Sequence, residues 1–124
     1  MIFGADVYHS GINEQYHPSI AAVCASMDPT ATIYSGRHSM NVKPRNETIE
    51  RLEEMVIDLL KTFRAKNGCL PQRIVFYRNG VSESQFRKVK EEEVAAMQNA
   101  FKGGYGDRPP KLTFIIVQKR RDTR

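Results

Sequence analysis

IVFYRNGVSESQF, residues 74–86, is the segment around which the predicted fold is organised. Its first half is a short apolar run of β-branched and aromatic side chains, which predicts a buried strand. The run ends at Asn79-Gly80, a pair that tolerates the positive φ angles of a tight turn. Ser82 and Gln85 then have the capping-box spacing that begins a helix. The stretch therefore predicts strand, turn and helix, with Asn79 at the carboxyl end of the strand, where open α/β sheets place ligands and chemistry.

Three strands are predicted before this stretch. Residues 2–8 form an apolar first strand that ends near Asp6, residues 19–27 form a second strand of small and apolar residues, and residues 32–40 form a third. Asp28-Pro29-Thr30-Ala31 has the composition of a type I turn between the second and third strands, so Asp28 is a turn residue rather than a catalyst. Together these residues predict a hairpin next to the first strand.

Helical spacing begins at Glu47. The apolar residues from Ile49 to Phe63 fall on one helical stripe, Asn46 is placed to cap the helix, and Asn67-Gly68 stops it. A strand at residues 73–78, a helix at residues 83–101 stopped by Gly103-Gly104, and a strand at residues 112–117 follow. The order is β-β-β-α-β-α-β. Because crossover connections are right-handed, the simplest fold is a mixed five-stranded α/β sheet of the ribonuclease H type with the first strand central.

The length and charge of the chain limit the classes of function that it can have. With 124 residues the chain is one domain, and its 40% hydrophobic and 27% charged residues are ordinary for a globular protein. No apolar run reaches the roughly 20 residues of a membrane helix. The net charge is +5, and residues 119–124 carry four cations and one anion, so this tail is either a solvated segment or a phosphate-binding strip. Cys24 and Cys69 lack metal or redox spacing, which predicts buried, reduced thiols.

The predicted fold brings Asp6 and Asn79 together. The first strand and the strand before Asn79 are neighbours in it, and two carboxylates at these positions would suit the paired Mg²⁺ ions of a phosphodiester hydrolase. Asp6 also fits a strand-end cap, and Glu47 fits an acid that improves a helix dipole by about 0.3–1 kcal/mol. His9, His17 and His38 have no ligand spacing, and His9 is predicted to order the loop after Asp6.

The residues closely resemble the PIWI domain of eukaryotic Argonaute proteins. The matching blocks, which include IFGADVYH (residues 2–9) and IVQKR (residues 116–120), span nearly the whole chain, and the block YRNGVSE (residues 77–83) is highly specific. The resemblance implies that residues 1–124 are a partial PIWI domain, the N-terminal and central part of a ribonuclease H-like core. It also implies a small guide RNA, a paired target RNA and, in slicing members, cleavage with Mg²⁺ or Mn²⁺.

The resemblance assigns roles to particular positions. Asp6 matches the first catalytic aspartate and metal ligand, Glu47 matches the glutamate that inserts into the active site, and Asn79 stands at the position of the second catalytic, metal-binding aspartate. The residues that resemble contacts to the guide backbone are Lys119, Arg120 and Arg124. The family also implies Trp-containing silencing proteins as partners, no membrane, and work in the cytoplasm or the nucleus.

Two departures from the family pattern limit the enzyme interpretation. Asn79 removes one negative charge from a site that must hold two divalent ions, and the family's last metal ligand lies beyond the matching residues. The hypothesis is therefore a silencing protein that resembles a metal-dependent RNA endonuclease but binds guide and target RNA without cutting. The alternative is a Mg²⁺-dependent guided endonuclease, a slicer, in which residue 79 was changed from Asp.

Overall fold

A computed structural model describes residues 1–9, 19–43 and 46–118. Its elements in chain order are the strands β1 (Ile2–Tyr8), β2 (Ser19–Ser26) and β3 (Tyr34–Asn41), the helix α1 (Leu52–Asn67), the strand β4 (Arg73–Val81), a 3-10 turn (Glu83–Gln85), the helix α2 (Phe86–Tyr105) and the strand β5 (Lys111–Gln118). The predicted order β-β-β-α-β-α-β is confirmed.

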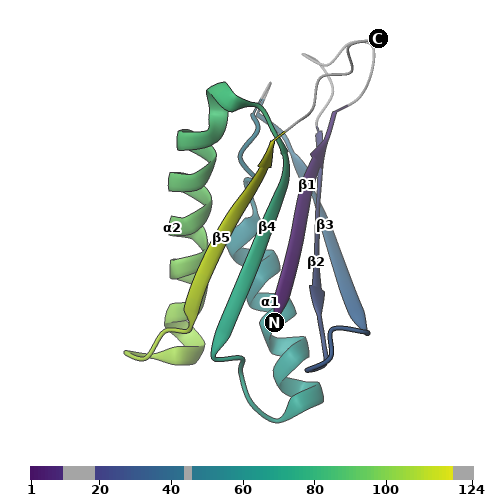
Figure 1. Cartoon of the computed structure of the whole chain (residues 1–124), viewed down its shortest axis with the longest axis vertical. Helices are drawn as coiled ribbons and strands as arrows, with labels where there is room; N and C mark the ends of the chain where they lie inside the picture. The colour runs from purple at the N-terminus through teal and green to yellow at the C-terminus, as the bar shows by residue number, and fades with distance from the viewer. Residues whose placement is uncertain (10–18, 44–45, 119–124) are drawn as a thin grey trace.

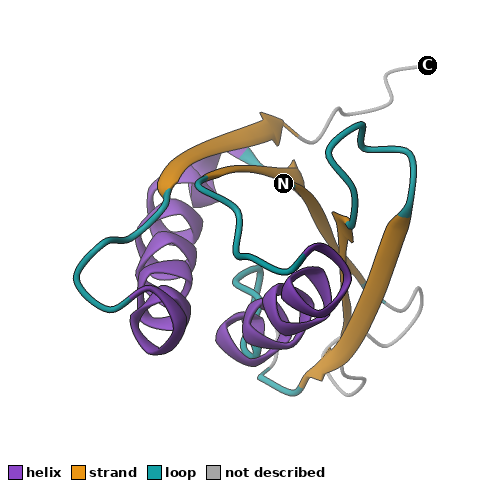
Figure 2. Ribbon diagram, turned by 90° about the horizontal axis from the view of Figure 1, so that it is seen from below, coloured by secondary structure: helices purple, strands orange, loops and turns teal. Residues whose placement is uncertain are grey.

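The five strands form one mixed sheet with the order β3-β2-β1-β4-β5 (Figure 1). β1 is antiparallel to β2 and parallel to β4, and β4 is parallel to β5. The prediction that the first strand is central and adjacent to the strand before Asn79 is therefore correct. Both α1 and α2 lie on the same side of this sheet (Figure 2).

Alternate residues of each strand face the two helices and form the core. On β1 these are Phe3, Ala5 and Val7, and on β4 Phe76 stacks between Phe3 and Phe114, with ring centroids 5.9 and 5.2 Å apart. The opposite face of the sheet, called the outer face below, has no covering layer among the described residues. Its exposed apolar side chains are Tyr8, Ile20, Tyr34, Met40, Tyr77 and Val117.

α1 begins five residues later than predicted. The Asn41 side chain donates to the Thr48 carbonyl (2.7 Å) and accepts from the Glu50 N–H (3.0 Å), while Asn46 bonds within the same segment. These bonds hold the residues from Asn46 to Glu50 as a loop that joins the end of β3 to α1. The predicted stop is confirmed, because Gly68 follows the helix in the left-handed conformation at φ +79°.

Three further sequence predictions need correction. β4 continues through Asn79-Gly80 to Val81 with a register irregularity, so this pair makes a bulge inside the strand rather than a turn. α2 continues past Gly103-Gly104 because the Tyr105 hydroxyl donates to the Pro71 carbonyl (2.5 Å) and its ring packs on Phe101. Both cysteines are free and exposed, not buried. Among the described residues, no helix is long and apolar enough to cross a membrane.

Candidate functional site

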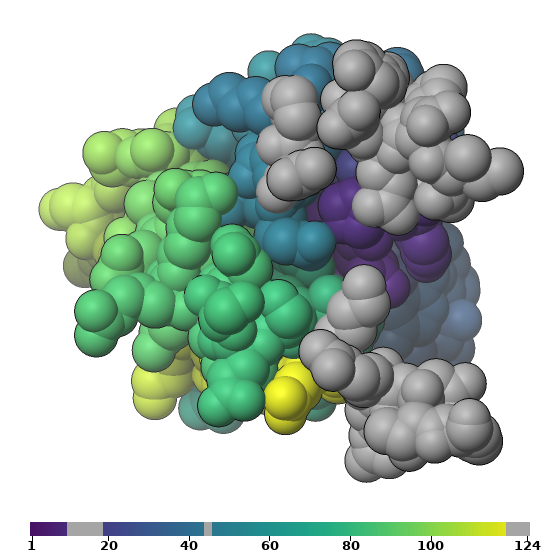
Figure 3. Space-filling model, turned by 90° about the horizontal axis from the view of Figure 1, so that it is seen from above, coloured from purple at the N-terminus to yellow at the C-terminus, as the bar shows by residue number. Residues whose placement is uncertain are grey.

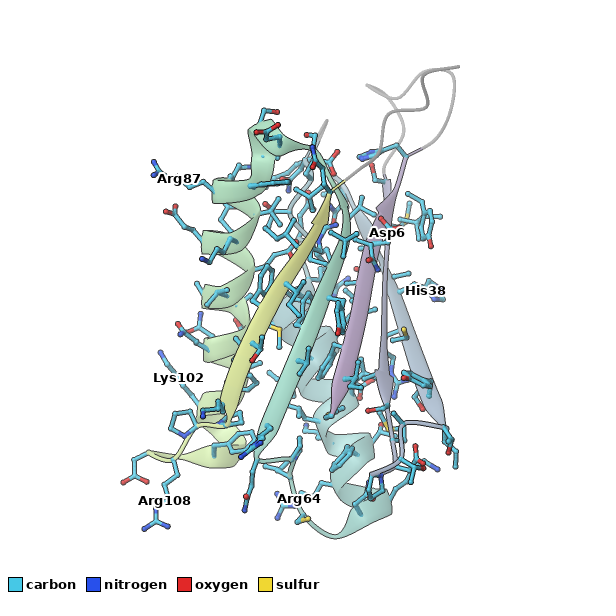
Figure 4. The ribbon with its side chains drawn as sticks, in the orientation of Figure 1. Asp6, His38, Arg64, Arg87, Lys102 and Arg108 are labelled. Carbon is cyan, nitrogen blue, oxygen red and sulfur yellow. The ribbon has the colours of Figure 1, made fainter. Side chains whose placement is uncertain are left out.

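Asp6 and Asn79 lie at the same end of two adjacent parallel strands. β1 and β4 are in register from Ile2–Val75 to Ala5–Arg78, so the next position along each strand is occupied by Asp6 and Asn79. Both residues are partly exposed, whereas their neighbours Ala5 and Arg78 are buried under the helices. The side chains of Asp6 and Asn79 therefore belong to the outer face, and Figure 4 shows Asp6 there.

The backbone next to Asn79 fits closely around the Asp6 carboxylate. Oδ1 of Asp6 accepts a hydrogen bond from the N–H of Val7 at 2.8 Å. A Cβ atom on Gly80 would lie 2.8 Å from the same oxygen, and Gly80 has a φ of +74°. The bulge at Asn79-Gly80 therefore requires glycine at position 80 for two reasons: the positive φ of its backbone and the space that the Asp6 carboxylate occupies.

Glu47 is held at this end by His9. Nε2 of His9 lies 2.9 Å from Oε2 of Glu47, and Nδ1 of His9 lies 2.7 Å from the Ser19 hydroxyl. His9 follows Asp6 by three residues, so this bridge connects the loop before α1 to the ends of β1 and β2. Glu47 is about a quarter exposed, at 23% of its side-chain surface.

A buried ion pair on the helix-covered side of the sheet holds the backbone of Glu47 and Asn79. Arg78 and Glu93 are both fully buried, and the Arg78 Nε lies 3.0 Å from each carboxylate oxygen of Glu93. The remaining Arg78 nitrogens donate to the backbone carbonyls of Asn79 (2.6 Å) and Glu47. Arg78 thus links β4, α2 and the loop that carries Glu47.

Glu93 also fixes the loop before α1, because its Oε2 accepts the N–H of Ile49 at 3.0 Å. Burial raises the pKa of Glu93, and the Arg78 guanidinium and the Ile49 N–H oppose that rise. Sequence reasoning missed both members of this pair. The available signal was the position of Glu93 four residues from Val89 and from Met97, on the stripe that α2 buries.

The structure therefore brings three predicted site residues to one end of the sheet: Asp6, Glu47 and Asn79. Figure 3 views this end from above, where the purple end of β1, the blue segment before α1 and the green start of α2 meet. Lys119, Arg120 and Arg124 lie outside the described residues. Within residues 1–9, 19–43 and 46–118, no group of three or more His, Cys, Asp or Glu side chains is arranged to hold a metal ion.

Comparison with known proteins gives consistent matches. A family model described as Piwi domain matches residues 1–124. Protein argonaute 18 of Oryza sativa subsp. japonica is 43% identical over 125 residues, which cover 100% of this chain and 11% of that protein. Protein argonaute 5 of Arabidopsis thaliana is 42% identical over 138 residues, covering 100% and 14%. The chain thus spans a small part of the length of these relatives.

Solved structures agree with the sequence matches. The C-terminal lobe of a budding yeast Argonaute has a TM-score of 0.85 at 29% identity, covering 98% of this chain and 25% of that chain. Kluyveromyces polysporus Argonaute, solved with a guide RNA, has a TM-score of 0.84 at 29% identity, covering 97% and 15%. The predicted ribonuclease H-like sheet is the fold of these Argonaute structures. The chain belongs to the Piwi domain family of Argonaute proteins.

Proposed function

We propose that this chain is part of an Argonaute-type silencing protein that holds a small guide RNA and its paired target without cutting the target. The observation that carries the proposal is Asn79, a neutral amide beside the Asp6 carboxylate at the ends of β1 and β4. Family membership supports the RNA-binding part, and one similar Argonaute was solved with a guide RNA.

The donor set does not fit a pair of divalent cations. Mg²⁺ and Mn²⁺ prefer oxygen ligands, and in the slicing members implied by the resemblance they activate water and neutralise the transferring phosphate. At Asp6 and Asn79 the two side chains supply one negative charge, and Glu47 is already bridged to His9. We therefore propose that these residues bind metal weakly or not at all and do not cleave the target.

The alternative proposal is a guided endonuclease whose residue 79 was originally Asp. Restoring the charge with Asn79→Asp in the intact protein, loaded with guide RNA and given Mg²⁺, separates the two proposals. The double variant Asn79→Asp with Asp6→Asn is the matched control, because it has the same net charge as the unaltered chain but exchanges the two side chains.

Cleavage by the single variant but not by the double variant would show that the lost charge alone prevents cutting. If the unaltered chain cuts its target at the rate of Asn79→Asp, the non-cutting proposal is wrong. RNA holding is tested separately by gel shift with short single-stranded RNA in low and high salt, and absence of salt-sensitive binding would contradict it.

The tail residues Lys119, Arg120 and Arg124 are proposed to contact the guide backbone, as the resemblance implies. Replacing all three by Gln removes three positive charges. We expect weaker RNA binding and a salt dependence whose slope falls by about 0.7 for each lost phosphate contact with a single strand. An unchanged slope in this triple variant would show that the tail is only solvated.

A Trp-containing silencing protein is a further proposed partner. The supporting observation is an apolar groove of about 360 Å³ between α1 and α2, lined by Ile57, Leu60, Leu70 and Tyr105 among others. Because the chain itself contains no Trp, the fluorescence of a Trp-containing peptide reports binding directly. Binding in this groove should shift the Trp emission of the peptide to shorter wavelength. Leu70→Lys should abolish this shift, whereas Val94→Lys, in the groove between α2 and β5, should not.

A further inference from the structure

Six exposed cations gather at the end of the molecule that lies away from Asp6. They come from the last turns of both helices, from the starts of β4 and β5, and from the loop before β5: Arg64, Lys66, Arg73, Lys102, Arg108 and Lys111. Figure 4 labels Arg64 and Arg108 at the lower end and Lys102 above them on the lower half of α2, while Asp6 lies in the upper half. These six residues are called the basic end below.

The chain topology brings the ends of these elements together. The Tyr105 hydroxyl at the end of α2 donates to the Pro71 carbonyl just before β4. The N–H of Lys111 donates to the Gln72 carbonyl at 2.9 Å. Arg73 and Lys111 are register partners at the start of β4 and β5, so two cations stand side by side on neighbouring strands.

The basic end has little compensating negative charge. Residues 64–73 and 102–111 contain Asp107 as their one acid, so these two segments together carry +5, from six cations and one anion. Asp28, in the turn after β2, accepts hydrogen bonds from its own turn. The ion pairs found among the described residues engage Arg37, Arg51, Arg78, Lys88 and His9, and none of them involves the basic end.

Helix dipoles account for only half of this arrangement. Arg64, Lys66 and Lys102 lie in the last turns of α1 and α2, where cations are favourable. The other three, Arg73, Arg108 and Lys111, lie on strand starts and a loop, where no dipole favours them. A concentration of unpaired like charge at one end of a molecule is typical of proteins that bind a polyanion.

We propose that the basic end binds the phosphodiester backbone of single-stranded RNA, as a second contact separate from the Asp6 end and from the tail. The choice of RNA over an acidic protein rests on the proposed function, since a protein that holds guide and target RNA meets this polyanion directly. The contact is to the backbone and carries no base specificity, because Lys and Arg on an open surface read charge rather than base edges.

The test compares two variants with the same change in net charge. The first replaces Arg64, Arg73, Arg108 and Lys111 by Gln. The matched control replaces Arg37, Lys61, Arg87 and Lys90, four cations outside the basic end, by Gln. The probe is a labelled ten-nucleotide single-stranded uridine RNA, titrated by fluorescence anisotropy with the complete chain at several salt concentrations.

We expect the basic-end variant to lose about tenfold or more in affinity at low salt. Its salt slope should fall by up to about 3, at about 0.7 for each of four phosphate contacts. The control should stay within about threefold of the unaltered chain. An equal loss in both variants, or no loss in either, would overturn the proposal while leaving RNA binding intact. No RNA binding by the unaltered chain would overturn the proposed function as well.

A footprint on the unaltered chain keeps the proposal testable if the variants fold poorly. Lysine acetylation is measured with and without the uridine RNA. Protection of Lys66, Lys102 and Lys111, but not of Lys88 and Lys90, is the expected result. Protection of the second group alone would contradict it. Protection of the basic end by poly-glutamate but not by RNA would mean that the surface binds an acidic protein instead.

Discussion

On β4, Phe76 and Arg78 face the two helices and are fully buried, whereas Tyr77 and Asn79 face away from them and are partly exposed. β1 shows the same alternation, with Ala5 buried and Asp6 on the outer face. The same two strands thus supply the core on one side of the sheet and the candidate site on the other. A change at position 79 alters the charge of the site without touching a buried side chain, so we expect the fold to tolerate Asn as well as Asp there.

Glu93→Ala should have the largest effect on stability, because it breaks the ion pair on the covered face. It leaves the buried Arg78 without a counter-charge, which typically costs about 3–5 kcal/mol, and it also leaves the Ile49 N–H without its acceptor. Urea unfolding followed by circular dichroism measures the loss. Glu54→Ala is the control, since its pair with Arg51 is largely exposed and contributes at most about 1 kcal/mol.

Phe76→Ala and Tyr77→Ala test the two faces at adjacent positions. Phe76 stacks with Phe3 and Phe114 in the core, so its truncation should cost about 3–5 kcal/mol. Tyr77 is 40% exposed on the outer face, and its truncation should cost about 1 kcal/mol or less. Equal losses in the unfolding free energy would mean that the outer face is covered in solution and that the two faces of β4 do not differ in burial.

The strands and their order could be predicted because their signals are local. The apolar runs of residues 2–8 and 73–78 and the handedness of crossovers sufficed to place Asp6 beside Asn79. The turn at Asp28 was also predictable, since Asp and Pro favour it directly, and the Ala31 N–H donates to the Asp28 carbonyl as a β-turn requires.

The start of α1 and the support of the site depend on contacts between distant residues. Asn41 holds Thr48 and Glu50 out of the helix, and Arg78 reaches Glu93 and the Glu47 carbonyl, 15 and 31 residues away. Helical spacing from Ile49 onward does not reveal such bonds, so sequence reasoning began the helix at Glu47. The length of β4 was underestimated for a related reason, because Asn79-Gly80 suits a bulge as well as a turn.

Gly80→Ala should lower the stability by an intermediate amount, and the structural change should be confined to the outer face around Asp6. Its φ of +74° costs a residue with a Cβ about 1–2 kcal/mol, and the new methyl group would displace the Asp6 carboxylate. Gly103→Ala, in α2 with free space around it, is the matched control and should stabilise by about 0.5–1 kcal/mol. A Gly80→Ala chain as stable as the unaltered one would show that the bulge does not keep this conformation in solution.

Asp28→Asn should have the smallest effect, at a turn far from both faces of the central strands. Hydrogen bonds from Thr30, Ile33 and Thr32 hold the pKa of Asp28 below its ordinary value of 3.8. Because the folded-state pKa is lowered, the carboxylate stabilises the fold above the unfolded-state pKa, and this contribution is lost as the pH falls through the folded-state value. The unaltered chain should therefore lose stability from about pH 4 downward, and Asp28→Asn should lose less over that range. Urea midpoints between pH 7 and about pH 2.5 measure the difference.

Asp107→Asn, which removes the same charge from an exposed loop, should keep the acid sensitivity of the unaltered chain. If the Asp107 variant instead flattens the pH profile as much as Asp28→Asn does, net charge rather than the hydrogen bonds of the turn governs acid stability.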